Sequence, residues 1–203
     1  MASDLRVLLV EDSPDDAELI RIELQRAGLA SVVHRVESAP GMLDAIAKRG
    51  WDIVISDFNL PGFSGTDALR ILREHTADTP FIVVSGHIGE AEAVALMKSG
   101  ADDWVMKDEL ARLSPAVERS LKEAHTRTQR KLAERALRES EERFKAIVSN
   151  IPGTVFQLVL QADGRWTFPF ISEGCLALFG VTPQLLQRFP EFFFDLVARS
   201  EEH

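Results

Sequence analysis

The sequence predicts an α/β fold: a doubly wound, five-stranded parallel sheet, then one long α-helix and a smaller α+β segment. Short apolar runs rich in Val and Ile alternate with amphipathic helical stretches in the first part of the chain. Such runs are typical of strands buried on both faces, and their alternation with helices predicts parallel strands with right-handed crossovers. A helical pattern that starts at Ser114-Pro115 then meets no breaker before Pro152-Gly153.

The expected elements of the sheet follow one another in regular order. Strands are expected at about 6–10, 31–36, 53–57, 81–84 and 103–106, and helices at about 14–27, 41–48, 65–75 and 90–99. In the first helix, Ser13 is a favourable N-cap and Pro14 suits the first helical position. Asp15 and Asp16 in its first turn stabilise the helix, because their negative charges lie at the positive end of the helix dipole. These units together predict a first domain at 1–125.

Four of the expected strands lead into residues that can bind a metal ion or a phosphoryl group. In chain order these are Glu11-Asp12, Asp57, Ser85-Gly86 and Lys107. The carboxyl ends of parallel strands meet at one edge of the sheet, where ligands bind in open α/β folds. Clustered carboxylates repel one another unless a cation lies between them, and an all-oxygen site suits Mg²⁺. Taken alone, Asp57 could equally well be a cap for the next element. The residues at the other strand ends favour a functional site instead.

The order and spacing of these strand-end residues, with the turn Leu60-Pro61-Gly62, resemble the receiver domain of two-component response regulators. The resemblance covers about the first 125 residues and implies the strand order 2-1-3-4-5. It also implies a phosphorelay function, in which Asp57 takes a phosphoryl group from a phosphohistidine. The implied partner is a sensor histidine kinase or a phosphotransfer protein. A receiver of this kind catalyses its own phosphorylation and dephosphorylation.

The resemblance further implies roles for individual residues. The implied Mg²⁺ ligands are Asp12, Asp57, the backbone carbonyl of Asn59 and, through water, Glu11. Phosphoryl oxygens are expected to bind Lys107 and Ser85, helped by backbone N–H groups near Asn59 and Gly86. Attack in line by a positioned carboxylate, with its charge neutralised, is the expected mechanism.

Three positions near the site differ from the family pattern or tune it. Asp108 follows Lys107, where the family often has proline, so the intervening peptide bond is either trans or a compensated cis bond. Trp104 stands where the family usually has a tyrosine or phenylalanine that swings inward on activation; plain packing is an equal alternative. His87, like Asn59, matches a position that tunes dephosphorylation, although a loop histidine is often simply solvated.

Charge and composition limit the function classes. Residues 1–108 contain 10 Lys+Arg and 19 Asp+Glu, so this part of the chain carries the whole net charge of -9. That excess argues against nucleic-acid binding by the first domain. The single cysteine, Cys175, excludes an internal disulfide. With no apolar run of transmembrane length and no signal-peptide pattern, a cytoplasmic protein without membrane contact is expected.

The helical pattern at 115–150 is longer than a single domain needs. Five Glu-to-Lys or Glu-to-Arg pairs at i,i+4 stabilise it as an exposed helix, Glu118–Lys122 and Glu134–Arg138 among them. Late in the helix, a short heptad seam is formed by Ala133, Leu137, Ser140, Phe144, Ile147 and Ile151. The seam favours a parallel homodimer, and a single solvated connector helix is the alternative.

The segment 151–203 resembles the start of a PAS sensor domain. The resemblance is carried by Glu139-Ser140-Glu141-Glu142-Arg143-Phe144 through Ile151-Pro152-Gly153, with Phe170-Ile171-Ser172 and Leu178-Phe179-Gly180. Strand-like stretches are expected at 154–160 and 166–171, and a helix at 172–179. The later strands of the family pattern are missing, so a fragment of a longer signalling protein is expected. Receiver, helix and PAS in this order resemble hybrid histidine kinases and diguanylate cyclases, and the sequence does not choose between these outputs.

Two other functions compete with the phosphoacceptor interpretation. In the first, the PAS segment is the sensory binding module and the receiver only regulates it. In the second, the chain is an aspartyl-phosphate phosphatase of the haloacid dehalogenase type. That chemistry requires a second aspartate two residues after the nucleophile, and position 59 is asparagine.

Overall fold

The computed structural model describes residues 5–29 and 31–200. The chain folds into two compact units, with the division between Lys131 and Leu132. The outermost residues of the predicted ranges 1–125 and 151–203, namely 1–4 and 201–203, lie outside the described residues.

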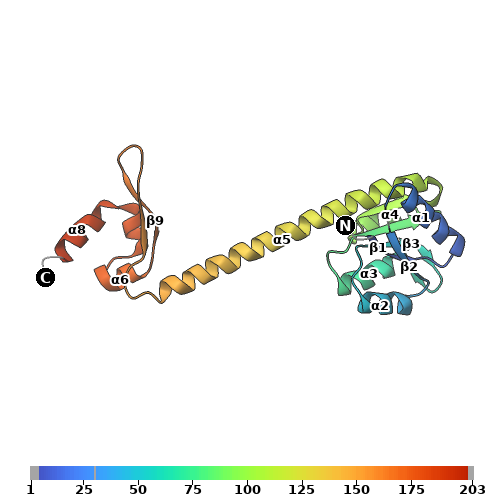
Figure 1. The fold of residues 1–203 in the computed structure, drawn as a ribbon, viewed down its shortest axis with the longest axis horizontal. Coiled ribbons are helices and arrows are strands. Elements are labelled where there is room, and N and C mark those ends of the chain that lie inside the picture. Colours follow the sequence, from blue (N-terminus) through green and yellow to red (C-terminus); the bar gives the residue numbers. More distant parts are fainter. Residues whose placement is uncertain (1–4, 30, 201–203) are drawn as a thin grey trace. The chain divides into compact units, whose positions relative to one another are not determined.

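The first unit is built on a five-stranded parallel sheet (Figure 1). Its strands are β1 (Leu5–Val10), β2 (Ser31–Val36), β3 (Ile53–Asp57), β6 (Phe81–Ser85) and β7 (Asp103–Met106). The order is β2-β1-β3-β6-β7, so the predicted order 2-1-3-4-5 is confirmed. All residues of β3 and β6 are buried, as two-sided coverage requires.

Helices cover both faces of this sheet. One face packs against α1 (Pro14–Arg26) and the first turns of α5 (Leu113–Ser149) through Ile20, Leu24, Ala116 and Val117. The other face packs against α2 (Ala39–Lys48), α3 (Gly65–His75) and α4 (Glu90–Lys98) through Met42, Ala45, Leu69, Leu72 and Leu96. These side chains make two separate apolar layers, which hold the strand ends rigidly in place.

Local sequence signals explain most of the boundaries. The hydroxyl of Ser13 accepts a hydrogen bond from the backbone N–H of Asp16, which confirms the predicted cap of α1. The predicted start of α2 at residue 41 is late, because Ser38 caps the helix and Pro40 occupies its first turn. The turn at Leu60-Pro61-Gly62 is part of a short antiparallel hairpin of β4 (Asn59–Leu60) and β5 (Phe63–Ser64). A 3-10 turn, η1 (Lys107–Arg112), joins β7 to α5.

Ion pairs attach the middle of α5 to the loops that precede β6 and β7. The guanidinium group of Arg127 donates to Asp102 at 3.2 Å, and Lys131 donates to Asp78 at 2.6 Å. The side chain of Asp102 is nearly buried, and it also accepts from Arg73 at 3.2 Å and from the backbone N–H of Phe81 at 2.9 Å. Asp102 is therefore the point at which α3, α5 and β6 are joined.

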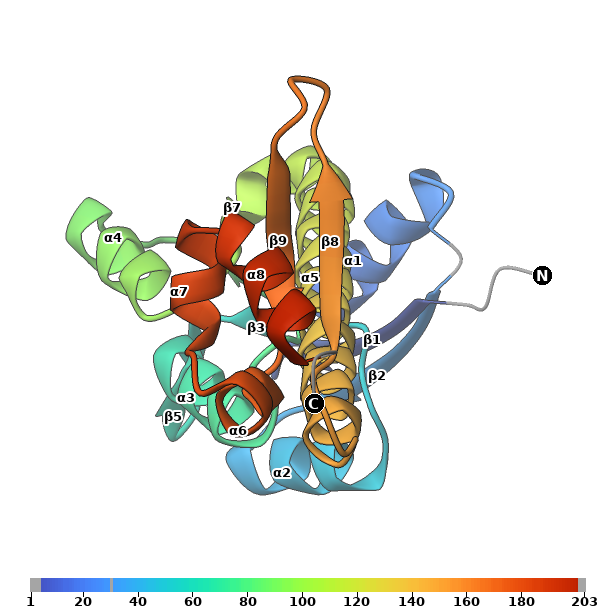
Figure 2. The ribbon, with the colours of Figure 1, turned by 90° about the vertical axis from the view of Figure 1, so that its left-hand side faces the viewer.

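The second unit contains an antiparallel pair of strands, β8 (Phe156–Leu160) and β9 (Trp166–Ile171), seen side by side in Figure 2. Three short helices follow: α6 (Gly174–Phe179), α7 (Pro183–Arg188) and α8 (Glu191–Ser200). Helix α6 begins two residues later than the predicted start at 172. A small core is formed by Phe168, Ile171, Cys175, Leu186 and Phe193. Cys175 is buried, and burial raises the pKa of its thiol.

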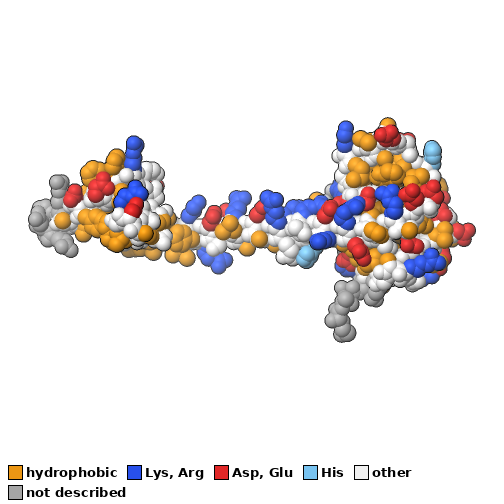
Figure 3. All heavy atoms as spheres, turned by 90° about the horizontal axis from the view of Figure 1, so that it is seen from above, with side chains coloured by type: hydrophobic (Ala, Val, Ile, Leu, Met, Phe, Trp, Pro, Cys, Tyr) orange, Lys and Arg blue, Asp and Glu red, His pale blue; other side chains and the backbone are white. Residues whose placement is uncertain are grey.

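Many large apolar side chains of residues 132–200 remain exposed, and Figure 3 shows them gathered on this unit. They include Leu137, Phe144, Ile147, Leu160, Leu178 and Phe192. Between its exposed apolar side chains, α5 also carries charged residues, which form i,i+4 ion pairs such as Arg135–Glu139 and Arg138–Glu142. Among the helices at 5–29 and 31–200, none combines the length and hydrophobicity of a membrane span.

Candidate functional site

The strand ends of the first unit bring a set of charged and hydroxyl side chains to one edge of the sheet. Asp57 is the last residue of β3 and Ser85 is the last residue of β6, while Glu11 directly follows β1. Glu11, Asp57 and Ser85 are buried, with exposed fractions of 0%, 7% and 1%. The predicted convergence of these strand ends is therefore present in the structure.

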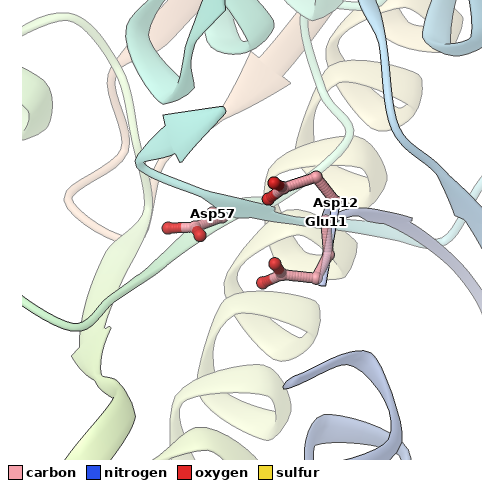
Figure 4. A group of neighbouring side chains, drawn as sticks. All are labelled: Glu11, Asp12 and Asp57. Atoms are coloured by element: carbon pink, nitrogen blue, oxygen red, sulfur yellow. The ribbon is translucent and has the colours of Figure 1, made fainter. Parts of the chain in front are cut away.

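Three carboxylates form the acidic part of the site, and Figure 4 shows them together. One oxygen from each of Glu11, Asp12 and Asp57 lies within 4.8 Å of the other two. Burial raises the pKa of Glu11, and the neighbouring charge of Asp57 raises it further. Hydrogen bonding from the N–H of Ser13 and the charge of Lys107 act in the opposite direction. Such a buried excess of negative charge is stabilised by a cation.

The donor atoms at this cluster fit Mg²⁺. All three side chains offer carboxylate oxygens, which are the ligands that a hard divalent ion prefers. The Oε2 atom of Glu11 is buried, and the Nζ atom of Lys107 lies 3.0 Å from it, so this oxygen already faces a cation. This set of carboxylate oxygens makes the cluster a candidate magnesium site.

Lys107 crosses the site from the end of β7. Its Nζ atom lies 2.8 Å from Oδ2 of Asp57, 2.5 Å from Oδ2 of Asp16 and 3.0 Å from Oε2 of Glu11. Burial alone would lower the pKa of Lys107, but hydrogen bonds to these three carboxylates outweigh burial and raise it well above its ordinary value. Lys107 is therefore a permanent cation at the edge of the sheet.

Asp57 is held through both of its carboxylate oxygens. Oδ2 accepts from Lys107, and Oδ1 accepts from the backbone N–H of Asn59 at 3.2 Å. Gly65 lies behind Asp57, where an added Cβ would come within 3.0 Å of the Asp57 carbonyl oxygen. A side chain at position 65 would push the backbone at Asp57 and Phe58, so only glycine fits there without a shift.

A family model for the response regulator receiver domain matches residues 7–118. The chain belongs to this family. Its receiver domain covers the sheet, the acidic cluster and the start of α5. Receiver domains of this family act in two-component signalling with histidine kinases or phosphotransfer proteins, and they bind Mg²⁺ in the acidic site.

Curated relatives agree with this assignment. The receiver is 33% identical over 124 residues to the transcriptional regulatory protein YkoG of Bacillus subtilis. The aligned residues make up 61% of this chain and 54% of YkoG. The receiver is also 37% identical over 106 residues to the sensory transduction protein RegX3 of Mycobacterium tuberculosis. Here the aligned residues make up 52% of this chain and 45% of RegX3. The chain thus spans about half the length of these relatives.

Solved receiver domains share the fold. A response regulator receiver domain protein from Clostridium thermocellum aligns with a TM-score of 0.55 at 26% identity, covering 60% of this chain and 98% of that one. The receiver domain of the sensor histidine kinase PA1611 from Pseudomonas aeruginosa PAO1 aligns with a TM-score of 0.52 at 23% identity, covering 59% and 99%. That structure has a magnesium ion coordinated in its active-site cleft.

The hydroxyl of Ser85 is engaged within its own loop in this receiver. Its Oγ atom donates to the backbone carbonyl of His87 at 2.8 Å and accepts from the backbone N–H of His87 at 3.3 Å. Gly86 and the His87 side chain are exposed. An added Cβ at Gly86 would meet no described atom within 4 Å. Within the described residues, the Ser85 hydroxyl is therefore hydrogen-bonded to the backbone of His87.

Trp104 lies on β7 and is partly buried against the core layer of α2, α3 and α4. It lines a hollow of about 450 Å³ together with Ile88, Val94 and Met97. The described peptide bonds are all trans, the bond between Lys107 and Asp108 included. The alternative of a cis bond at that position is thereby excluded for this structure.

Two residues that support the site were not predicted from the sequence. Arg35 on β2 donates to the backbone carbonyls of Glu11 and Asp12, at 3.1 Å in each case, and also pairs with Glu37. Asp16 binds Lys107. In the sequence Asp16 has the pattern of a first-turn helix acid, and its place in the first turn of the helix that directly follows Glu11-Asp12 is the signal that could have placed it near the site.

Proposed function

We propose that Asp57 accepts a phosphoryl group from a phosphohistidine of a sensor histidine kinase or a phosphotransfer protein. The observation that supports this most directly is the environment of Asp57. Its carboxylate is buried at a strand end, held by Lys107 and the N–H of Asn59, and faces Glu11 and Asp12. This arrangement presents a fixed nucleophile beside an acidic cation site and a permanent cation.

In the proposed reaction, a carboxylate oxygen of Asp57 attacks the phosphorus atom. The new O–P bond forms as the N–P bond to histidine breaks, and the departing imidazole nitrogen takes up a proton from solvent. Asp12, Asp57 and the carbonyl of Asn59 would hold Mg²⁺ directly, with Glu11 acting through water. Bound there, Mg²⁺ would neutralise the charge that develops on the phosphoryl oxygens.

The chain's own residues complete the site in two movements. Lys107 exchanges a carboxylate partner for a phosphoryl oxygen, which its three N–H donors allow. Ser85 breaks its hydrogen bonds with His87 and turns its hydroxyl toward the phosphoryl group, where N–H groups near Asn59 and Gly86 also bind. His87 and the side chain of Asn59 are proposed to influence the water that later hydrolyses the acyl phosphate.

Chemical phosphorylation tests this proposal. Acetyl phosphate and Mg²⁺ should add one phosphoryl group that hydroxylamine and base remove. Asp57→Asn should abolish the label, whereas Asp44→Asn, which changes an exposed aspartate in the same way, should retain it. Equal labelling of the Asp57→Asn protein would disprove the assignment of the phosphoacceptor. Omitting Mg²⁺ should reduce labelling of the unaltered protein strongly.

We also propose that α5 relays the phosphorylation state and pairs with α5 of a second chain as a parallel homodimer. The support is the exposed apolar seam at Leu137 and Ile147 between charged faces. Phe144 of the same seam packs against Phe170 with ring centroids 5.2 Å apart, so part of it is already used within the second unit. Sedimentation should show a dimer that Leu137→Glu separates, while Leu132→Glu, off the seam, leaves it intact.

The second unit is proposed to be the first part of a PAS-like domain at 151–203 that connects to an output domain. Two antiparallel strands followed by short helices, with much exposed apolar surface, support this proposal. A histidine kinase or a diguanylate cyclase remains the proposed output. Expression of the gene with the sequence that follows residue 203, and an assay for either activity, would test it.

A further inference from the structure

Asp16 contacts Lys107, and the phosphoryl transfer proposed above gives Asp16 no role. Its Oδ2 atom lies 2.5 Å from Nζ of Lys107, compared with 2.8 Å for Asp57 and 3.0 Å for Glu11. The shortest ion pair of Lys107 is thus with Asp16, which lies in the first turn of α1 and not at the end of a strand. The Lys107 side chain is only 21% exposed, so this pair is shielded in part from solvent.

Asp16 differs from the other partners of Lys107 in one respect. Glu11 and Asp57 belong to the cluster of oxygens that lie within 4.8 Å of one another, and Asp16 does not. A divalent cation that binds the cluster competes with Lys107 for Glu11 and Asp57, and it repels the ammonium group. Asp16 is then the carboxylate that continues to attract Lys107 toward the site.

The backbone around Asp16 is fixed well enough for this role. Its N–H donates to the Ser13 hydroxyl at 3.2 Å, and the next residue, Ala17, is buried in the core layer under α1. The N–H of Ser13 in turn donates to Oε1 of Glu11 at 3.0 Å. The carboxylate of Asp16 therefore approaches Lys107 from a capped helix whose first turn is tied to the acidic cluster.

We propose that Asp16 is a positioning residue that holds the ammonium group of Lys107 at the site when the cluster binds Mg²⁺. The benefit for phosphoryl transfer rests on the proposed function of Asp57. With Asp16 present, Lys107 stays within reach of an incoming phosphoryl oxygen. Without it, the flexible lysine side chain leaves the cation, and its donors are no longer oriented in advance.

The neighbouring aspartate provides a matched control. Asp15 is exposed in the same helical turn, so Asp15→Asn removes the same charge from the same helix end. Asp16→Asn also removes that charge, and in addition it weakens the contact with Lys107. Asp16→Glu keeps the carboxylate on a longer side chain and should restore part of the effect. The difference between the two Asn variants isolates the contact.

The first measurement is the ¹⁵N resonance of the Lys107 ammonium group at saturating Mg²⁺, assigned by its loss in Lys107→Arg. We expect a protected resonance in the unaltered protein and in Asp15→Asn, and its exchange broadening in Asp16→Asn. Asp16→Glu should recover it in part. A Lys107 resonance that Asp16→Asn leaves unchanged overturns the positioning role, whatever the phosphorylation assay shows.

The second measurement is the rate of labelling by acetyl phosphate at saturating Mg²⁺. Asp16→Asn should react about tenfold more slowly than Asp15→Asn, because a misplaced charge loses orientation at the reacting group. Equal rates in the two variants overturn the consequence for phosphoryl transfer. Failure of the unaltered protein to label at Asp57 would instead refute the proposed function, and the ammonium resonance would still decide the role of Asp16.

Discussion

Asp102 gives the sharpest prediction about the stability of the receiver. Its carboxylate accepts from the N–H of Phe81, a fully buried residue, and from Arg73 and Arg127. Asp102→Ala leaves the buried N–H without an acceptor, which costs about 1–3 kcal/mol. The two ion pairs involve partly exposed guanidinium groups, so each adds at most about 1 kcal/mol. We therefore expect a loss of about 1–5 kcal/mol in the free energy of unfolding.

Two further substitutions separate these contributions. Asp102→Asn keeps an oxygen for the N–H of Phe81 and removes only the charge, so about 1–2 kcal/mol should be lost. Asp78→Ala breaks the exposed pair with Lys131 and should cost less than about 1 kcal/mol. Urea unfolding followed by tryptophan fluorescence in a Trp166→Phe background measures all three. If Asp102→Ala costs no more than Asp78→Ala, the buried hydrogen bond does not stabilise the fold as argued.

Three other predictions follow from the site and its surroundings. Asp12→Ala should weaken Mg²⁺ binding more than Glu11→Ala in a calorimetric titration, because direct coordination is lost; equal losses would reject the proposed ligand set. In a variant with Trp104 as its sole tryptophan, fluorescence should change with beryllofluoride and Mg²⁺, and a flat signal on an occupied site would leave Trp104 as packing only. Hydrogen bonding from Arg6 lowers the pKa of Asp52, so its stabilising effect is present above about pH 4 and is lost as the pH falls through the lowered pKa. Asp52→Asn should therefore flatten the acid side of a plot of urea midpoint against pH, and an unchanged slope would contradict this.

The sheet and the strand-end residues could be predicted because their signals are local and independent of one another. The strands β1, β3 and β6 are short and mostly buried runs, and parallel connectivity alone brings Asp57, Ser85 and Lys107 to one edge. The order of the strands came from the family resemblance, since hydrophobic pattern does not specify which strands are neighbours. The start of α2 at Ala39 was missed because a proline within the first turn suggests a break rather than part of the helix.

The supporting contacts depend on side-chain directions that a linear pattern does not contain. Asp16 and Asp15 have the same chemistry and adjoin each other, yet the rotation of α1 brings Asp16 to Lys107 and leaves Asp15 exposed. Phe144 has the spacing of a heptad seam, but its ring packs on Phe170 of β9. Helices α7 and α8 were not predicted because their short, phenylalanine-rich stretch has no clear period.

The two hydrogen bonds between Ser85 and the His87 backbone have a consequence for the unstimulated protein. If each contributes about 0.5–1.5 kcal/mol, the loop favours its resting form by about 1–3 kcal/mol. That preference corresponds to roughly 1–15% of molecules with the hydroxyl already released at any moment. Under the proposed function, the level of basal signalling would then be a property of a three-residue loop. Phosphorylation would enlarge a population that already exists.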